Sequence, residues 1–158
     1  MYNDLFNACV NFVFDREGRV YENNSDDPGG ETKFGISKKS YPDINIENLT
    51  EDQAAAIYYR DYWTPMMCDK YEPRLALALF DTAVNNGVGT AQILLADFNG
   101  VVPTAEQFLF KRLRRYFNIV QKNPKMAVWL DDWLLRVLKI VELPVTYFPS
   151  TLVDRFLK

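Results

Sequence analysis

The chain has 158 residues, of which 48% are apolar and 15% aromatic, and its net charge is −3. This length fits one domain, or one domain with a small appendage. The sequence has no run of 18 uncharged apolar residues, and its start lacks the features of a Sec-type signal peptide, so we expect neither a membrane-spanning helix nor Sec export. It also has no histidine, which excludes Ser-His-Asp and Cys-His nucleophile systems and any zinc site that needs a histidine.

In chain order, the first predicted element is an amphipathic helix over residues 4–16, because apolar residues recur there every three and four positions. Gly18 is its expected C-cap, which places Glu17 in the last turn. A Pro-Gly-Gly turn cluster then separates "RVYE" from "TKFGIS", and this pattern predicts a short hairpin or β-like lobe.

Six further helices follow, and their start and stop signals mark them. Capping boxes open two of them, at Thr50 and at Thr104, and prolines occupy the first helical position of two others. The predicted helical segments are "LTEDQAAAIYYRDYW", "PRLALALFDTAVNNG", "TAQILLADFNG", "AEQFLFKRLRRYFNIVQKN", "PKMAVWLDDWLLRVLKIVE" and "PSTLVDRFLK". The predicted fold is therefore mainly α, with one small β lobe near the N-terminus.

The two cysteines, Cys9 and Cys68, lie in apolar, helix-like surroundings, so we expect two buried thiols rather than a disulfide. Two cysteines alone cannot form a Cys-only zinc site, and we expect no metal or cofactor. Proton transfer near neutral pH must then depend on carboxylates, tyrosine or lysine.

Basic residues are concentrated in segment 104–139, which holds eight of them against three acidic residues. The segment therefore has a net charge of +5, which leaves −8 on the rest of the chain. The eight are Lys111, Arg112, Arg114, Arg115, Lys122, Lys125, Arg136 and Lys139. Such a segment is typical of a surface that meets a polyanion, or of a solvated helix face, and both interpretations stay open. We expect no nucleic acid as a partner, because the basic residues alternate with core-type aromatic residues at helical spacing.

Glu17 follows a buried helix, and a carboxyl there is near the negative end of the macrodipole and beside apolar neighbours. Both features favour protonation, which suits a general acid. A second carboxylate and a hydroxyl on the polar lobe would stay in water and orient a nucleophilic water molecule. Eight residues separate Glu17 from Asp26 and five separate Asp26 from Thr32, and this stretch resembles phage-type lysozymes.

The motifs resemble more closely those of glycosyl hydrolase family 108, a group of phage and bacterial N-acetylmuramidases. Its pattern E-G-G … D-P-G-G-x-T-x-x-G-I-[ST] is similar to Glu17-Gly18 and "DPGGETKFGIS". The segments "AAIYYRDYWTPMMCD" and "LALALFDTAVNNGVGTA" resemble its later motifs, so the likeness covers residues 5–91.

The sequence departs from the family pattern at two points. Arg19 stands where the family has its second glycine, and one residue is inserted before the turn. The family motif therefore indicates Asp27 as the second carboxylate, whereas lysozyme spacing indicates Asp26, and both stay candidates.

This resemblance implies a lysozyme-like hydrolase that cuts the β-1,4 bond between N-acetylmuramic acid and N-acetylglucosamine in peptidoglycan. Glu17 would protonate the glycosidic oxygen, while Asp26 or Asp27, with Thr32, would position or activate water. We expect substrate contacts from Tyr21, Phe34, Tyr58, Trp63 and Asn85. The resemblance also implies a monomeric phage endolysin, held in the host cytoplasm until a holin-type release lets it reach the periplasmic cell wall.

Two regions are expected from the extent of the motifs. Residues 1–89 form the lysozyme-like catalytic region, and residues 90–158 form a helical C-terminal region packed into the same globule. The second region resembles a peptidoglycan-binding domain only in part, through Tyr116, Trp133 and Arg136. Two other functions stay open: a lytic transglycosylase, which would use Glu17 without a water-activating carboxylate, and a non-enzymatic wall-binding or virion protein, which would fit the altered Arg19.

Overall fold

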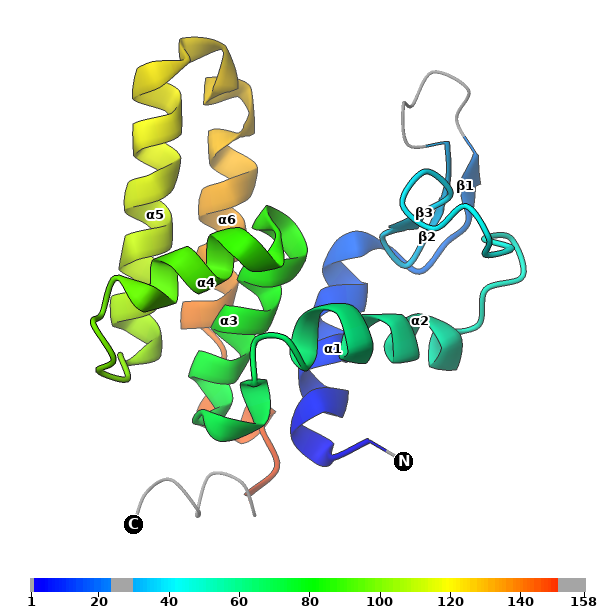
Figure 1. The fold of residues 1–158 in the computed structure, drawn as a ribbon, viewed down its shortest axis with the longest axis horizontal. Coiled ribbons are helices and arrows are strands. Elements are labelled where there is room, and N and C mark those ends of the chain that lie inside the picture. Colours follow the sequence, from blue (N-terminus) through cyan, green and yellow to red (C-terminus); the bar gives the residue numbers. More distant parts are fainter. Residues whose placement is uncertain (1, 24–29, 151–158) are drawn as a thin grey trace. The chain divides into compact units, whose positions relative to one another are not determined.

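The computed structural model describes residues 2–23 and 30–150, and the chain divides into two compact units. Unit 1 is Met1–Thr64 and unit 2 is Pro65–Lys158, and Figure 1 shows their elements. The boundary predicted from motif coverage, between residues 89 and 90, falls inside helix α4, Val88–Ala96, of unit 2. The division into a catalytic and a C-terminal region therefore stays a prediction. Within the described ranges, no helix is both long and apolar enough to cross a bilayer.

Unit 1 opens with helix α1, Asp4–Glu17, as the apolar spacing predicts. The Asn3 side chain caps its start by accepting a hydrogen bond from the Phe6 amide at 2.8 Å. Gly18 ends the helix with φ 90°, and its N–H donates to the Phe14 carbonyl, so the predicted glycine C-cap is confirmed. The side chains that α1 buries are Leu5, Phe6, Cys9, Val10, Phe12, Val13 and Phe14.

A three-stranded antiparallel sheet follows α1, in the order β1-β2-β3. Its strands are β1 Glu22–Asn23, β2 Glu31–Lys33 and β3 Ile36–Ser37. The hairpin predicted between "RVYE" and "TKFGIS" corresponds to β1 and β2, but "TKFGIS" also folds back on itself to form β3. This second turn is possible because Phe34 and Gly35 both take positive φ, 54° and 74°.

Helix α2, Glu51–Tyr58, has the capping box predicted from Thr50 and Gln53. It continues directly into a π-helical turn, Tyr59–Trp63, so the single helix predicted here has two parts. The aromatic rings of α1 and of this turn pack together, because Phe6 meets the edges of Tyr59 and Trp63 at centroid distances of 4.9 and 5.2 Å. These contacts join the two helices into the core of unit 1.

In the described part of unit 2, all regular elements are helices or helical turns. Its elements are α3 Pro73–Asn86, α4 Val88–Ala96, α5 Ala105–Lys122 and α6 Leu130–Val141, with 3-10 turns at Cys68–Lys70, Pro124–Trp129 and Val145–Tyr147. Figure 1 shows α5 and α6 as a long hairpin beside α3 and α4. The segment predicted as one helix from Pro124 is therefore a 3-10 turn followed by α6. Of the predicted last helix "PSTLVDRFLK", residues 151–158 lie outside the described residues.

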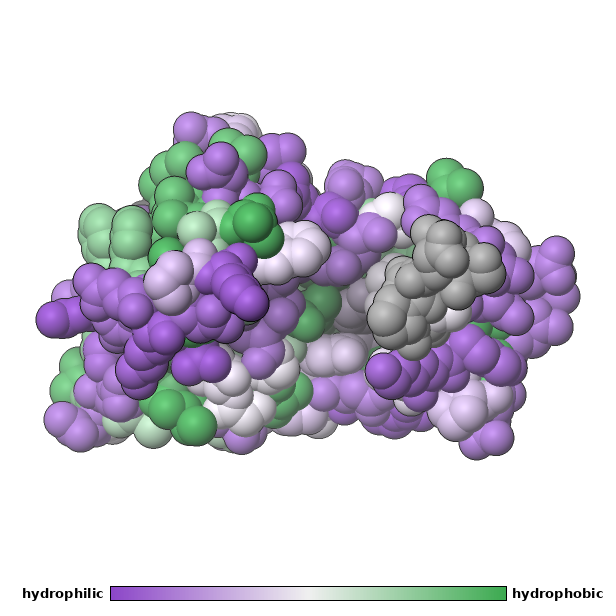
Figure 2. All heavy atoms as spheres, turned by 90° about the horizontal axis from the view of Figure 1, so that it is seen from above, coloured by the Kyte–Doolittle hydropathy of each residue, from purple (hydrophilic) through white to green (hydrophobic). Residues whose placement is uncertain are grey.

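The mainly α fold with a small β lobe near the N-terminus is confirmed. Cys9 and Cys68 are both buried, and neither forms a disulfide. The two units differ at their surfaces, because most of the large hydrophobic side chains that are exposed belong to unit 2 (Figure 2). These side chains include Ile93, Phe110, Phe117, Val128, Trp129, Leu135 and Leu138.

Candidate active site

Glu17 is the last residue of α1, and its half-buried side chain lies against the turn between β2 and β3. The contact is with the backbone of Gly35. A Cβ atom on Gly35 would come within 2.8 Å of the Glu17 Cβ and 2.7 Å of the Tyr58 hydroxyl oxygen. Only glycine fits this position, and the close packing fixes the first two carbons of the Glu17 side chain.

The turn that meets Glu17 is itself fixed from two sides. Tyr58 on α2 donates a buried hydrogen bond of 2.8 Å from its hydroxyl to the Phe34 carbonyl. The Phe34 ring packs on Phe14 of α1, with ring centroids 5.0 Å apart. A non-glycine residue with positive φ is uncommon and costs free energy, and these two contacts stabilise Phe34 in that conformation.

Thr32 lies on the central strand β2, opposite Glu22 and Ser37. It is half-buried, and its hydroxyl donates only a long hydrogen bond of 3.4 Å to the Gly30 carbonyl. The weakness of that bond leaves the hydroxyl able to bind water. Asp26 and Asp27 fall in segment 24–29, outside the described residues, between the chain ends of β1 and β2.

Tyr21 connects α1 to β1 and is half-buried. Partial removal from water raises the pKa of its phenol, and the nearby Glu31 and Glu47 carboxylates raise it further. The phenol therefore stays protonated at neutral pH and can donate a hydrogen bond.

Arg19, the residue that departs from the family motif, ties the end of α1 to the start of α2. Its guanidinium pairs with Asp15 at 2.9 Å and with Glu51 at 2.7 Å, and it lies over the Phe14 ring. The pKa of Arg19 is raised, chiefly by its hydrogen bond to Glu51. A glycine could make none of these contacts, so Arg19 adds a link between two helices close to Glu17.

Three of the predicted substrate contacts are buried in unit 1. Tyr58 and Phe34 take part in the turn described above, and Trp63 is 0% exposed against Phe6. These positions favour a role in holding the site together, and substrate contact by these residues stays a prediction.

Asn85 lies on α3 of unit 2, where its side-chain oxygen accepts hydrogen bonds from Arg112 at 3.2 Å and from the Tyr116 hydroxyl at 3.0 Å. It belongs to a buried polar network centred on Asp81. Arg112 reaches one Asp81 oxygen at 2.6 Å, and Arg136 reaches the other at 2.8 Å. The network thus joins α3, α5 and α6.

The negative charge of Asp81 in this network is stabilised by the positive charges of Arg112 and Arg136. Burial raises the pKa of Asp81, but the positive charges and hydrogen bonds of Arg112 and Arg136 outweigh this, so the pKa lies below that of an ordinary carboxyl. Tyr116 accepts a hydrogen bond from Arg112 and stacks on Trp133 with ring centroids 4.7 Å apart. The downstream motif residues are therefore brought together in unit 2, where Tyr116 and Arg136 are buried and Trp133 is half-buried.

Sequence reasoning missed Gly35, Asp81 and Arg112. A signal existed for Arg112, because it falls four residues after Phe108 and four before Tyr116, on the apolar stripe of α5. Asp81 is surrounded in sequence by apolar residues of α3. Across residues 2–23 and 30–150, no group of three His, Cys, Asp or Glu side chains could hold a metal ion.

The fold is shared with a solved structure. That of Brucella abortus SagA superposes with a TM-score of 0.68 at 21% sequence identity, and the match covers 85% of this chain and 90% of that chain. At this identity the likeness shows the fold alone. No curated protein sequence matches the chain.

The fold, with a carboxylate at the end of a buried helix beside a small sheet, is that of a lysozyme-like glycoside hydrolase. Residues 10–87 match the family model of glycosyl hydrolase 108, and the chain belongs to that family. Its general function is therefore that of a peptidoglycan-acting glycoside hydrolase.

Proposed function

We propose that the chain hydrolyses the β-1,4 bond between N-acetylmuramic acid and N-acetylglucosamine, with Glu17 as the general acid. The observation that supports this role most is the packing of Glu17 against Gly35. A general acid must lie within hydrogen-bond reach of the leaving oxygen, and it acts best when its position is fixed beforehand. Glu17 combines a half-buried side chain with a fixed stem, next to the sheet that carries Thr32.

The second group would be Asp26 or Asp27, assisted by Thr32. Both aspartates belong to the connection between β1 and β2, and Thr32 lies on β2 at the end of that connection. A carboxylate there would either stabilise the oxocarbenium-like transition state or orient the attacking water. The half-buried Tyr21, next to β1, is the aromatic residue best exposed among the predicted contacts of unit 1 to meet a sugar.

The test is mass spectrometry of muropeptides released from purified peptidoglycan by the wild-type chain, Glu17→Gln and Glu22→Gln. Glu22 is a matched control, because it is an exposed carboxylate on the neighbouring strand β1. We expect products with reducing muramic ends, a loss of about two to four decades in rate for Glu17→Gln, and a near wild-type rate for Glu22→Gln.

Other outcomes would identify other functions. Muramic ends in the 1,6-anhydro form would show a lytic transglycosylase, and no release by the wild-type chain would support a wall-binding or virion protein. A Glu17→Gln variant within a few-fold of the wild-type rate would remove Glu17 from the mechanism.

The two aspartates are separated by single replacements. We expect Asp26→Asn to lower turnover more than Asp27→Asn, because Asp26 has the lysozyme-type spacing from Glu17 and Thr32. If Asp27→Asn lowers turnover more than Asp26→Asn, the inserted residue is accommodated before Asp26, and Asp27 is the second carboxylate, as the family motif indicates. Normal hydrolysis by both variants would exclude a catalytic carboxylate at either position.

The proposed setting is that of a phage endolysin, which waits in the host cytoplasm and reaches the cell wall after a holin-type release. Lysis of host cells that express the chain only when a membrane-permeabilising protein is co-expressed would support this setting. Lysis without that protein would contradict it.

A further inference from the structure

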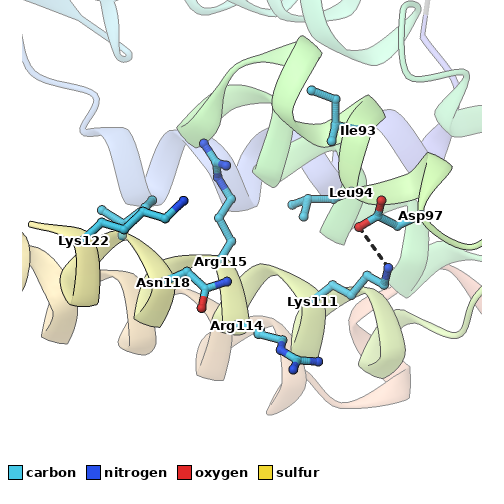
Figure 3. Close-up of a pocket in the computed structure, with 9 residues that line it drawn as sticks. Ile93, Leu94, Asp97, Lys111, Arg114, Arg115, Asn118 and Lys122 are labelled. Carbon is cyan, nitrogen blue, oxygen red and sulfur yellow. Dashed lines mark ion pairs between the residues drawn. The ribbon is translucent and has the colours of Figure 1, made fainter.

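The structure places six of the eight basic residues of segment 104–139 in two groups. Arg112 and Arg136 are buried with Asp81, as described above. Half of the eight instead line one pocket of about 470 Å³ between α4 and α5 in unit 2 (Figure 3). The lining residues are Ile93, Leu94, Asp97, Lys111, Arg114, Arg115, Asn118, Ile119 and Lys122.

The pocket carries a surplus of positive charge. Asp97 is the only acidic residue in its lining, and it pairs with Lys111 at 3.0 Å (Figure 3). Arg114, Arg115 and Lys122 make no ion pair with the described residues. Figure 3 shows Arg115 and Lys122 rising from α5 into the space beside α4. Arg115 and Lys122 beside α4, with Arg114 at the rim, give this concave site a positive charge that favours an anionic ligand.

Three of the four cations, Lys111, Arg115 and Lys122, form a row that also contains Asn118. Positions 111, 115, 118 and 122 are spaced by four, three and four residues, so they share one face of α5, with neighbouring Cβ atoms about 5–6 Å apart. Within the row, the two cations without an ion pair among the described residues, Arg115 and Lys122, are seven residues apart, which is about 10 Å along a helix that rises about 1.5 Å per residue. Such a row matches an extended ligand with repeated charges better than a single compact anion.

The chemistry of the lining narrows the class of ligand. Two arginines offer planar forks of N–H donors that bind phosphate oxygens in pairs, and Asn118 adds a neutral polar group. The remaining surface is aliphatic, from Ile93, Leu94 and Ile119. Among the described residues, none that lines the pocket is aromatic, whereas proteins that bind single-stranded nucleic acids stack bases on aromatic rings.

We propose that the α4–α5 pocket binds an aliphatic phosphodiester polymer, of the polyol-phosphate type, along the cation row. Phosphates would pair with Arg115, Lys122 and, at the rim, Arg114, while the carbon backbone would lie on the aliphatic floor. This binding does not depend on the hydrolytic function proposed above, and it can be measured without any cleavage.

The test measures fluorescence anisotropy of a labelled, short poly(glycerol phosphate) with the full chain over a range of salt concentrations. The pocket variant is Arg115→Gln with Lys122→Gln. The matched control is Lys125→Gln with Lys139→Gln, which removes the same charge at exposed positions outside the pocket lining. We expect the pocket variant to lose at least about tenfold in affinity and its salt dependence to weaken by roughly one ion pair per cation removed. The control should stay within about twofold of the wild type, because its cations lie outside the pocket.

Three outcomes would overturn the proposal. Equal losses in both variants would show a general effect of net charge. Equal or tighter binding of a polyglutamate of the same charge would show that phosphate is not preferred, and tighter binding of single-stranded DNA would show a nucleic-acid site. Circular dichroism and thermal melting of both variants, expected to match the wild type, ensure that a loss of affinity reports on the pocket.

Discussion

The two units use charged motif residues in opposite ways. In unit 1, Glu17 lies half-buried at a helix end, against a glycine that leaves room for it. In unit 2, Asp81 is completely buried between two arginines, which satisfy both of its oxygens. A charged residue in a family motif therefore indicates chemistry only where water or substrate can reach it. Where counter-charges enclose it, the motif residue stabilises the fold instead.

In unit 2, we expect the largest loss of stability from Asp81→Asn, which removes the negative charge between the two buried arginines. The amide keeps the shape but leaves Arg112 and Arg136 buried without a counter-charge, and removing one partner of a buried ion pair costs about 3–5 kcal/mol. Denaturant unfolding, with amide hydrogen exchange resolved for α3, α5 and α6, measures this loss.

The control for that prediction is Asp97→Asn, which removes an exposed partner of Lys111. We expect it to change the free energy of unfolding by less than about 1 kcal/mol. If Asp81→Asn proves equally mild, the network does not hold α3, α5 and α6 together, and the contrast between the units fails.

The second-largest effect is expected in unit 1, at the contact between Gly35 and Glu17. Gly35→Ala places a Cβ within 2.9 Å of two Glu17 carbons and forces a strained φ, so we expect a loss of about 1–3 kcal/mol and a lower hydrolytic rate. Gly30→Ala is the matched control, because Gly30 also has positive φ, 69°, but no heavy atom of the described residues lies within 4 Å of its Cβ position. Parallel rate and stability measurements should show that Gly30→Ala costs strain alone. A Gly35→Ala enzyme with full activity would mean that this contact does not position Glu17.

The smallest effect is a pH dependence confined to unit 2. The pKa of Asp81 is lower in the folded than in the unfolded chain, because Arg112 and Arg136 stabilise its ionised form more than burial destabilises it. Its contribution is therefore fully present above the unfolded pKa of about 3.9 and is lost as pH falls through the lower, folded pKa. Unfolding of the wild type should become easier below about pH 4, and Asp81→Asn should show a shallower dependence there. Identical acid profiles would contradict the assignment.

Local signals in the sequence predict the elements well. The cap at Gly18, the capping boxes at Thr50 and Thr104 and the proline that opens α3 each depend on nearby residues, and all are present. The breaks at Tyr59 and Leu130, where a π turn ends α2 and a 3-10 turn precedes α6, were not predicted, because no proline or glycine marks them.

The sites were harder to predict, because they depend on contacts between distant residues. The place of Glu17 follows from its helix, but the need for glycine at position 35 arises from α1 and α2 meeting one turn. Arg112 and Arg114 look alike in the run "KRLRR", yet one is buried and the other is exposed. Only the partner helices α3 and α6 decide which of them becomes structural.

The two cysteines give each unit its own internal reporter. Cys9 belongs to unit 1 and Cys68 to unit 2, and both thiols are shielded in the native fold. Burial, reinforced by the nearby Asp69, raises the pKa of Cys68 and suppresses its reactive thiolate until that segment opens. In a chain that keeps only one of the two cysteines, the rate of modification by a thiol reagent would therefore measure how often that unit opens locally. No label has to be added to the protein.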